Sequence, residues 1–126
     1  MGKRVLVIED EVNISEALQF ILSRDGWDVL THAEGGDAVD VVGRTVPDVL
    51  ILDVMLPGRS GFDILRALRG ATATAQLPVL MLTAKGQAAD RAMAQEVGAT
   101  LFMTKPFANA EIVAAIRDLA RACDAP

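Results

Sequence analysis

Cysteine, basic charge and long apolar runs are all scarce in this chain of 126 residues. The one cysteine, Cys123, excludes an internal disulfide and a cysteine-based zinc site. It suits a reducing compartment, and we expect the cytoplasm. No apolar run approaches the ~18 residues that a membrane span needs. Lysine and arginine number 12 against 17 acidic residues, a net charge of −5, which argues against direct nucleic-acid binding by this domain.

The chain has the length and composition of one globular domain. Hydrophobic residues make up 52% and charged residues 23%, which is enough to bury a core without metal or disulfide staples. We expect a single domain over residues 1–126. Residues 120–126 suit either a tail or the start of a linker, and the sequence leaves both open.

Short apolar runs alternate with segments of helical spacing. The runs are continuous rather than alternating, which is typical of parallel strands that helices cover on both faces. A fifth segment, Trp27–Thr31, mixes polar and apolar residues and suits an edge strand. The four apolar runs are Val5–Ile8, Val49–Leu52, Val79–Leu82 and Leu101–Met103.

Helical periodicity fills the intervals between these runs. The alternation predicts an α/β fold, a flavodoxin-like doubly wound parallel sheet of five strands in the order 2-1-3-4-5 with five helices. In that order ligands bind just beyond the carboxyl ends of the strands, beside the first and third. The helical segments are Ile14–Leu22, Ala38–Val42, Ile64–Leu68, Ala88–Val97 and Ile112–Leu119.

Chemically active side chains follow four of the five predicted strands. They are Glu9 and Asp10, Asp53, Thr83 and Lys105. Parallel strands place these residues at one edge of the sheet, where crowded carboxylates favour a hard divalent cation such as Mg²⁺. The lysine and the hydroxyl suit a phosphoryl group on a carboxylate. Any one of these acids is explained equally well by a helix N-cap or a solvated loop, so the joint pattern carries the hypothesis.

Four segments resemble the receiver domain of bacterial response regulators, and the resemblance covers essentially the whole chain. It implies that Asp53 accepts a phosphoryl group from the phosphohistidine of a sensor histidine kinase or a histidine phosphotransfer protein. The segments are Val5–Glu11 (VLVIEDE), Asp53–Gly61 (DVMLPGRSG), Thr83-Ala84 and Thr104–Phe107 (TKPF).

The resemblance also implies a role for each residue around the phosphoacceptor. Asp10 would bind Mg²⁺ directly and Glu9 through water, with the backbone carbonyl of Met55 as a further ligand and Mn²⁺ as an alternative ion. Thr83 would act as the switch hydroxyl, and Lys105 would pair with a phosphoryl oxygen. Two further positions follow from the same resemblance, a cis peptide bond before Pro106 and a switch aromatic at Phe102.

Three positions depart from the pattern common in this family. Phe102 has no hydroxyl group and stands where many members carry Tyr or His. Met55 and Lys85 stand where the family modulates the attack of water on the phosphoaspartate. Because an apolar Met55 offers no group that orients this water, we expect slow autodephosphorylation.

The resemblance places an output face on the segments Ala88–Val97, Leu101–Met103 and Ile112–Leu119. Arg91 and Glu111 suit one ion pair of a phosphorylation-dependent homodimer, or a pair that is merely solvated. Leu101 and Ala115 stand where an acid and a base are usual. An apolar face for an unknown downstream protein is an alternative, and it would comprise Ala94, Leu101, Ala108, Ala114 and Ala115.

The kinase-facing side is predicted near the start of the first helix. Ile14, Ser15 and Leu18 would contact the kinase together with Pro106 and Phe107, although Ile14 and Leu18 suit the core equally well.

Two other function classes compete with a signalling receiver. An aspartyl-phosphate hydrolase of the haloacid dehalogenase class would need a second Asp where Met55 stands. A phosphorylation-independent interaction domain would have no need to gather charge at one sheet edge. We therefore expect a non-enzymatic receiver that catalyses its own phosphorylation, without contact to nucleic acid or membrane.

Overall fold

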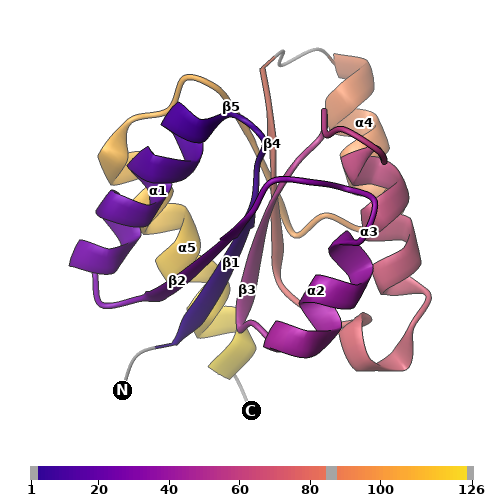
Figure 1. Cartoon of the computed structure of the whole chain (residues 1–126), viewed down its shortest axis with the longest axis horizontal. Coiled ribbons are helices and arrows are strands. Elements are labelled where there is room, and N and C mark those ends of the chain that lie inside the picture. The colour runs from indigo at the N-terminus through magenta and orange to yellow at the C-terminus, as the bar shows by residue number, and fades with distance from the viewer. Residues whose placement is uncertain (1–2, 85–87, 125–126) are drawn as a thin grey trace.

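A computed structural model describes residues 3–84 and 88–124 of the chain. Five strands alternate with five helices, and a short 3₁₀ helix precedes the fourth strand (Figure 1). The elements are β1 (Arg4–Ile8), α1 (Val12–Arg24), β2 (Asp28–His32), α2 (Ala38–Thr45), β3 (Val49–Asp53), α3 (Gly61–Arg69), η1 (Thr72–Thr74), β4 (Val79–Thr83), α4 (Ala88–Val97), β5 (Leu101–Thr104) and α5 (Asn109–Asp124).

All strands are parallel and form one sheet in the order β2-β1-β3-β4-β5, which confirms the predicted topology. The register aligns the strand ends: Ile8 lies opposite Leu52, and Thr83 lies opposite Thr104. The residues that follow β1, β3, β4 and β5 are therefore brought to a common edge of the sheet.

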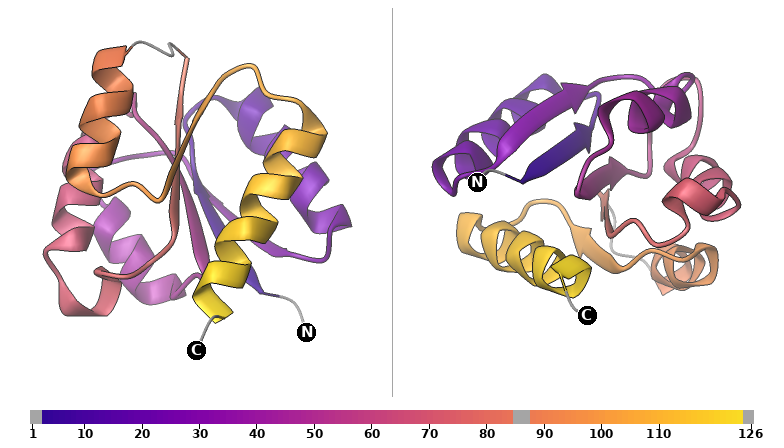
Figure 2. Two further views of the ribbon diagram at one scale, coloured as in Figure 1. Left: turned by 180° about the vertical axis from the view of Figure 1, so that it is seen from behind. Right: turned by 90° about the horizontal axis from the view of Figure 1, so that it is seen from below.

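Helices cover the sheet on both faces. Helices α1 and α5 lie on one face, and α2, α3 and α4 lie on the other (Figures 1 and 2). The central strands are consequently buried along their length, and every residue of β3 and β4 is buried. This is the arrangement that their continuous apolar runs predict.

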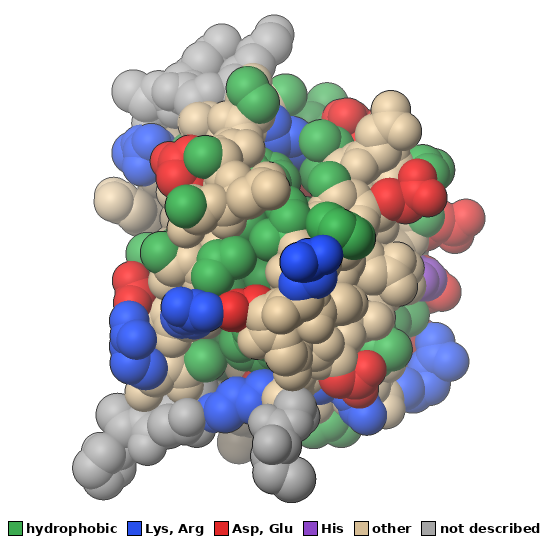
Figure 3. Space-filling view, turned by 90° about the vertical axis from the view of Figure 1, so that its left-hand side faces the viewer, with side chains coloured by type: hydrophobic (Ala, Val, Ile, Leu, Met, Phe, Trp, Pro, Cys, Tyr) green, Lys and Arg blue, Asp and Glu red, His purple; other side chains and the backbone are tan. Residues whose placement is uncertain are grey.

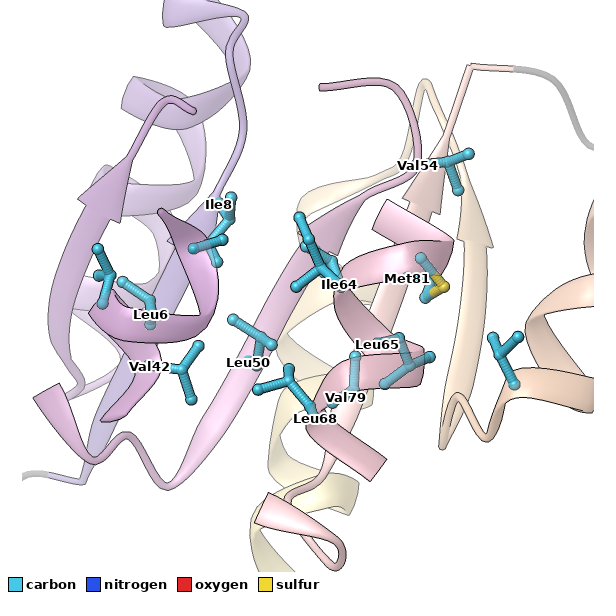
Figure 4. Packing of buried hydrophobic residues seen from close by; sticks show 14 of the residues in the cluster. Leu6, Ile8, Val42, Leu50, Val54, Ile64, Leu65, Leu68, Val79 and Met81 are labelled. Carbon is cyan, nitrogen blue, oxygen red and sulfur yellow. The ribbon is translucent and has the colours of Figure 1, made fainter. Parts of the chain in front are cut away.

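The sheet divides the hydrophobic core into two clusters. On the α2–α3–α4 face, alternate residues of β1 and β3 form one cluster with residues of helices α2 and α3 (Figure 4). The opposite cluster joins the sheet to α1 and α5 through Leu18, Leu22, Ile112 and Ile116. Figure 3 views the molecule from this second side, where hydrophobic side chains gather between the two helices and charged ones surround them.

Several boundaries differ from those the sequence indicates. Strand β2 is shifted by one residue, from Trp27–Thr31 to Asp28–His32. Residues 120–124 continue helix α5 rather than forming a tail, because the buried stripe extends past Leu119 to Ala120. The turn η1 has no apolar periodicity and was not predicted. Among residues 3–84 and 88–124, no helix is long and apolar enough to cross a membrane.

Candidate functional site

The carboxyl edge of the sheet gathers the side chains that the sequence singled out. Glu9 follows β1, Asp53 ends β3 and Thr83 ends β4, and these residues are only 2%, 2% and 3% exposed. Backbone hydrogen bonds continue past the strand ends and fix these positions. The amide of Val54 donates to the carbonyl of Leu82 at 2.9 Å, and the amide of Lys105 donates to the carbonyl of Thr83 at 2.8 Å.

Lys105 is the cation of this edge. Its side chain is 8% exposed, and its ammonium lies among carboxylates from two different strand ends. Nζ is 2.7 Å from Oε1 of Glu9 and 3.4 Å from Oδ2 of Asp53. Oε1 of Glu11 also lies 3.5 Å from Nζ, at the exposed rim of the group. Within the part of the chain that the structure describes, one ammonium therefore faces three carboxylates.

Three carboxylates at this edge are close enough to bind one metal ion, and this set includes Asp10 in place of Glu11. Ligand oxygens of Glu9, Asp10 and Asp53 all lie within 4.8 Å of one another. Oε1 of Glu9 is buried and has no hydrogen-bond partner among the described residues, and its 2.7 Å contact with Nζ of Lys105 is an ion pair. This one buried oxygen without a hydrogen-bond partner, together with the carboxylates of Asp53 and the exposed Asp10, is a donor set that fits Mg²⁺.

Burial and the neighbouring charges shift the pKa values of Glu9 and Lys105. Burial, helped by the neighbouring Asp53, raises the pKa of Glu9 to about 7 even though contacts with Lys105 and the amide of Glu11 lower it. Burial would lower the pKa of Lys105, but its contacts with Glu9 and Asp53 outweigh that effect and raise the pKa. A divalent cation would relieve the same repulsion that a proton on Glu9 relieves.

The turn between β3 and α3 forms the opposite wall of this edge. An open pocket of about 490 Å³ is lined by Asp10 and by turn residues that include Met55 and Ser60. The Met55 side chain is 73% exposed, so it points away from the core. The turn ends where Ser60 caps α3, its hydroxyl accepting from the amide of Phe62 at 3.1 Å.

A family model for the response regulator receiver domain matches residues 5–117. The chain belongs to that family. Receiver domains are the signalling modules of two-component systems, and the fold described above is the fold of the solved relatives.

Three solved structures show how general this likeness is. A putative response regulator from Chloroflexus aurantiacus J-10-fl is 31% identical, with a TM-score of 0.92, and the match covers 96% of this chain and 99% of that one. The receiver domain of a signal transduction histidine kinase from Syntrophus aciditrophicus is 29% identical, with a TM-score of 0.89 over 96% and 92% of the two chains. The BeF3-activated N-terminal receiver domain of Klebsiella pneumoniae RstA is 29% identical, with a TM-score of 0.88 over 94% and 98%.

The residues predicted to act as a switch, Thr83 and Phe102, lie on β4 and β5. Thr83 is buried beside Asp53 at the strand ends, and Phe102 is partly buried against the α4 side of the sheet. The guanidinium of Arg91 lies 4.9 Å from the centre of the Phe102 ring, a cation–π contact between α4 and β5. Lys85, which the sequence names as a rate-modulating position, lies outside the described residues.

The predicted output face is less apolar than the sequence suggested, because two of its alanines are buried. Ala94 and Ala115 are 0% and 8% exposed, so neither belongs to an exposed docking face. Ala115 lies on the stripe of α5 that packs on the sheet with Ile112 and Ile116. Leu101 is 38% exposed and stays at the surface. Glu111 is also exposed, and its Oε1 accepts from the amide of Ala108 at 2.8 Å, capping the start of α5.

The residues predicted to meet the kinase divide into core and surface. Leu18 is fully buried and Ile14 packs partly on the same cluster, so Leu18 belongs to the core. Ser15 is half-buried and Pro106 is exposed, and the Lys105–Pro106 peptide bond is cis. Glu11, which contacts Lys105, was not predicted to belong to the site, although it directly follows the two acidic residues Glu9 and Asp10 in the sequence.

Proposed function

We propose that this receiver domain accepts a phosphoryl group on Asp53 from the phosphohistidine of a sensor histidine kinase or a histidine phosphotransfer protein. One observation carries the proposal: the buried carboxylate of Asp53 lies in one cluster with Glu9 and Asp10, and the Lys105 ammonium is 3.4 Å from its Oδ2. A carboxylate held between a cation site and an ammonium is placed to become an acyl phosphate. We propose a cytoplasmic location for this reaction.

The proposed transfer conserves atoms and charge in a single displacement. An oxygen of Asp53 forms a bond to phosphorus as the bond from phosphorus to the donor nitrogen breaks, and the imidazole leaves with the electron pair. Mg²⁺, or Mn²⁺ in its place, supplies charge neutralisation for the phosphoryl oxygens when bound. Glu9, Asp10, Asp53 and the carbonyl of Met55 are the groups that would hold it.

The remaining side chains act on the phosphoryl group once it has arrived. Lys105 pairs with one phosphoryl oxygen, for which it has to leave its contact with Glu9. Thr83 donates its hydroxyl to another oxygen. Its movement toward the phosphoryl group makes room for Phe102, and the rearrangement of α4, β5 and α5 is then read by a downstream protein or by a second copy of the chain.

Two other functions are less well supported. Aspartyl-phosphate hydrolases of the haloacid dehalogenase class require a second carboxylate two positions after the nucleophile, where Met55 stands. A binding module that works without phosphorylation has no use for buried acids, and Glu9 and Asp53 are each 2% exposed.

The test is the intact mass of the protein after incubation with acetyl phosphate. We expect one added phosphoryl group in wild type with Mg²⁺, and none after removal of Mg²⁺ or in Asp53→Asn. Asp63→Asn is the matched control, because Asp63 is an exposed carboxylate on α3 whose partner is Arg66. An adduct that persists in Asp53→Asn would refute the proposal.

A further inference from the structure

The β2–α2 loop and the β3–α3 turn contact each other near the acidic cluster. The segment between β2 and α2 carries Gly35 and Gly36, and the turn between β3 and α3 carries Pro57 and Gly58. The amide of Gly35 donates to the carbonyl of Pro57 at 2.9 Å. This hydrogen bond connects the turn that follows Asp53 to the loop that follows the edge strand β2.

The contact depends on the missing side chain of Gly35. A Cβ atom at this position would lie 2.4 Å from the carbonyl oxygen of Arg59 and 3.1 Å from its amide nitrogen. Both atoms belong to the backbone, so no flexible side chain can move aside. A Cβ at the neighbouring Gly36 would meet nothing within 4 Å. Gly35 is buried and Gly36 is exposed, which agrees with this difference.

The β2–α2 loop leads from Gly35 directly into the buried start of α2, whereas the middle of the opposing turn is exposed. The carbonyl of Gly35 accepts from the amide of Ala38 at 3.2 Å, and Ala38 is fully buried at the start of α2. In the opposing turn, Met55 is 73% exposed, and Pro57 and Gly58 are exposed as well. A side chain inserted at Gly35 would therefore displace the turn rather than the helix.

We propose that Gly35 is a positioning residue that holds the β3–α3 turn, and with it the carbonyl of Met55, at the cation site. This inference rests on the proposed function, because it assumes that the cluster binds Mg²⁺. The pocket beside the cluster is lined by Asp10 from one side and by Met55, Leu56 and Pro57 from the other, so a displaced turn moves away from the acids.

The experiment is a calorimetric titration of Mg²⁺ into wild type, Gly35→Ala and Gly36→Ala. We expect Gly35→Ala to raise the dissociation constant about tenfold, the size of effect that groups behind the ligands have on metal affinity. The number of sites stays at one. Gly36→Ala is the matched control, because it adds the same methyl group to the same loop, and we expect wild-type affinity.

The titration separates positioning from general damage. A variant that is partly unfolded has fewer sites at an unchanged dissociation constant, whereas a displaced turn raises the dissociation constant at full occupancy. If Gly35→Ala does not fold, Gly58→Ala carries the test from the opposing loop, since Gly58 has φ of +85° and a Cβ there would lie 3.2 Å from the amide nitrogen of Gly36. The same rise is expected.

Equal Mg²⁺ affinity in wild type and a folded Gly35→Ala variant would overturn the inference and leave the proposed function intact. Failure of the proposed function shows itself differently, in the wild-type protein alone. Wild type would then take up no phosphoryl group on Asp53 and bind no Mg²⁺, and the inference would fall with it.

Discussion

Glu9 is a buried carboxyl group at the end of β1, and its environment favours the neutral form. Its side chain is fully buried, and the negative charge of Asp53 lies in the same cluster. Among the described residues, the cation that compensates Glu9 in the absence of a metal ion is the ammonium of Lys105, which Glu9 shares with Asp53 and Glu11. The folded protein therefore holds a proton on Glu9 at pH values where the unfolded chain has released it.

The stability of the Mg²⁺-free protein should fall as the pH rises from 4.5 to about 7. The pKa of Glu9 is about 7 in the folded protein against 4.5 in the unfolded chain, so between these values the folded state binds more protons. The loss is at most about 3 kcal/mol, and it is complete above pH 7.

Urea unfolding in EDTA at several pH values measures this slope. In Glu9→Gln the fall should be much smaller, because the amide does not titrate. Glu16→Gln, which removes an exposed carboxylate from α1, is the control and should unfold with the wild-type pH dependence. Parallel pH profiles for wild type and Glu9→Gln would contradict this account of Glu9.

Met55 controls the lifetime of the phosphorylated state in our account. Its apolar, 73% exposed side chain borders the acidic edge and offers no hydrogen bond to an attacking water. We expect Met55→Asn to speed dephosphorylation about fivefold, the effect of one net hydrogen bond in the transition state. Decay of the phosphoryl adduct by intact mass measures the rate. An unchanged half-life in Met55→Asn would rule out this role.

The site residues at the strand ends could be predicted from the sequence, whereas the contact made by Glu11 in the loop after β1 could not. Glu9, Asp53, Thr83 and Lys105 each follow an apolar run, and parallel strands bring such residues together whatever the loops do. The contact of Glu11 with Lys105 depends on how the first turn of α1 leaves the sheet. No periodicity in the sequence encodes that direction.

At the scale of whole elements, Arg69 joins α3 to the α4–β5 turn and to η1. It ends α3, and its side chain donates from Nε to the carbonyl of Gly98 at 2.9 Å and from an Nη to the carbonyl of Thr74 at 3.0 Å. Burial lowers its pKa, which is consistent with its place between the α4–β5 turn and η1. The side chain holds the C-terminal end of α4 relative to α3.

Arg69→Met should lower the free energy of unfolding by about 2 kcal/mol, because two carbonyl groups lose a charged donor in a partly buried site. Chemical denaturation measures the change. Arg66→Met is the matched control on the same helix. Its ion pair with Asp63 is exposed and joins neighbouring turns of one helix, so we expect a loss below about 1 kcal/mol. Equal losses in the two variants would show that Arg69 has no special role.

Local sequence patterns predicted the ends of α4 but not which face of α5 is buried at Ala115. The segment Ala88–Val97 matches α4 from end to end, because Gly86 and Gly98 flank it in the sequence. The prediction that Ala115 lies on an exposed docking face was wrong, because an alanine by itself does not indicate which face of a helix is buried. Only the positions of Ile112, Ile116 and Leu119, three and four residues apart, place Ala115 on the buried side.

At the scale of the whole molecule, three acidic side chains from distant parts of the sequence meet at one edge of the sheet. The net charge is −5, and the carboxylates of Glu9, Asp10 and Asp53 lie within reach of one ion at the carboxyl end of the sheet. An ion that binds only the assembled cluster stabilises the folded state, because the unfolded chain scatters its ligands. The stability of the fold and occupation of the site are therefore linked.

Mg²⁺ should raise the melting temperature of wild type and leave that of Asp10→Asn nearly unchanged. At one hundred times its dissociation constant, the ion adds about 2.7 kcal/mol to the free energy of unfolding. Thermal unfolding with MgCl₂, against NaCl at equal ionic strength, separates site binding from screening. A shift of the same size in Asp10→Asn would place the stabilising ion elsewhere.

The central claim is that Asp53, and no other carboxylate of the cluster, receives the phosphoryl group. The most direct measurement is reduction of the acetyl phosphate-treated protein with borohydride, which converts an aspartyl phosphate to homoserine, followed by peptide mass mapping. The account predicts homoserine at position 53 alone, and only in samples that contained Mg²⁺. A reduced side chain at Asp10 or Glu9, or an unmodified Asp53 in a protein that carries the phosphoryl adduct, would contradict it.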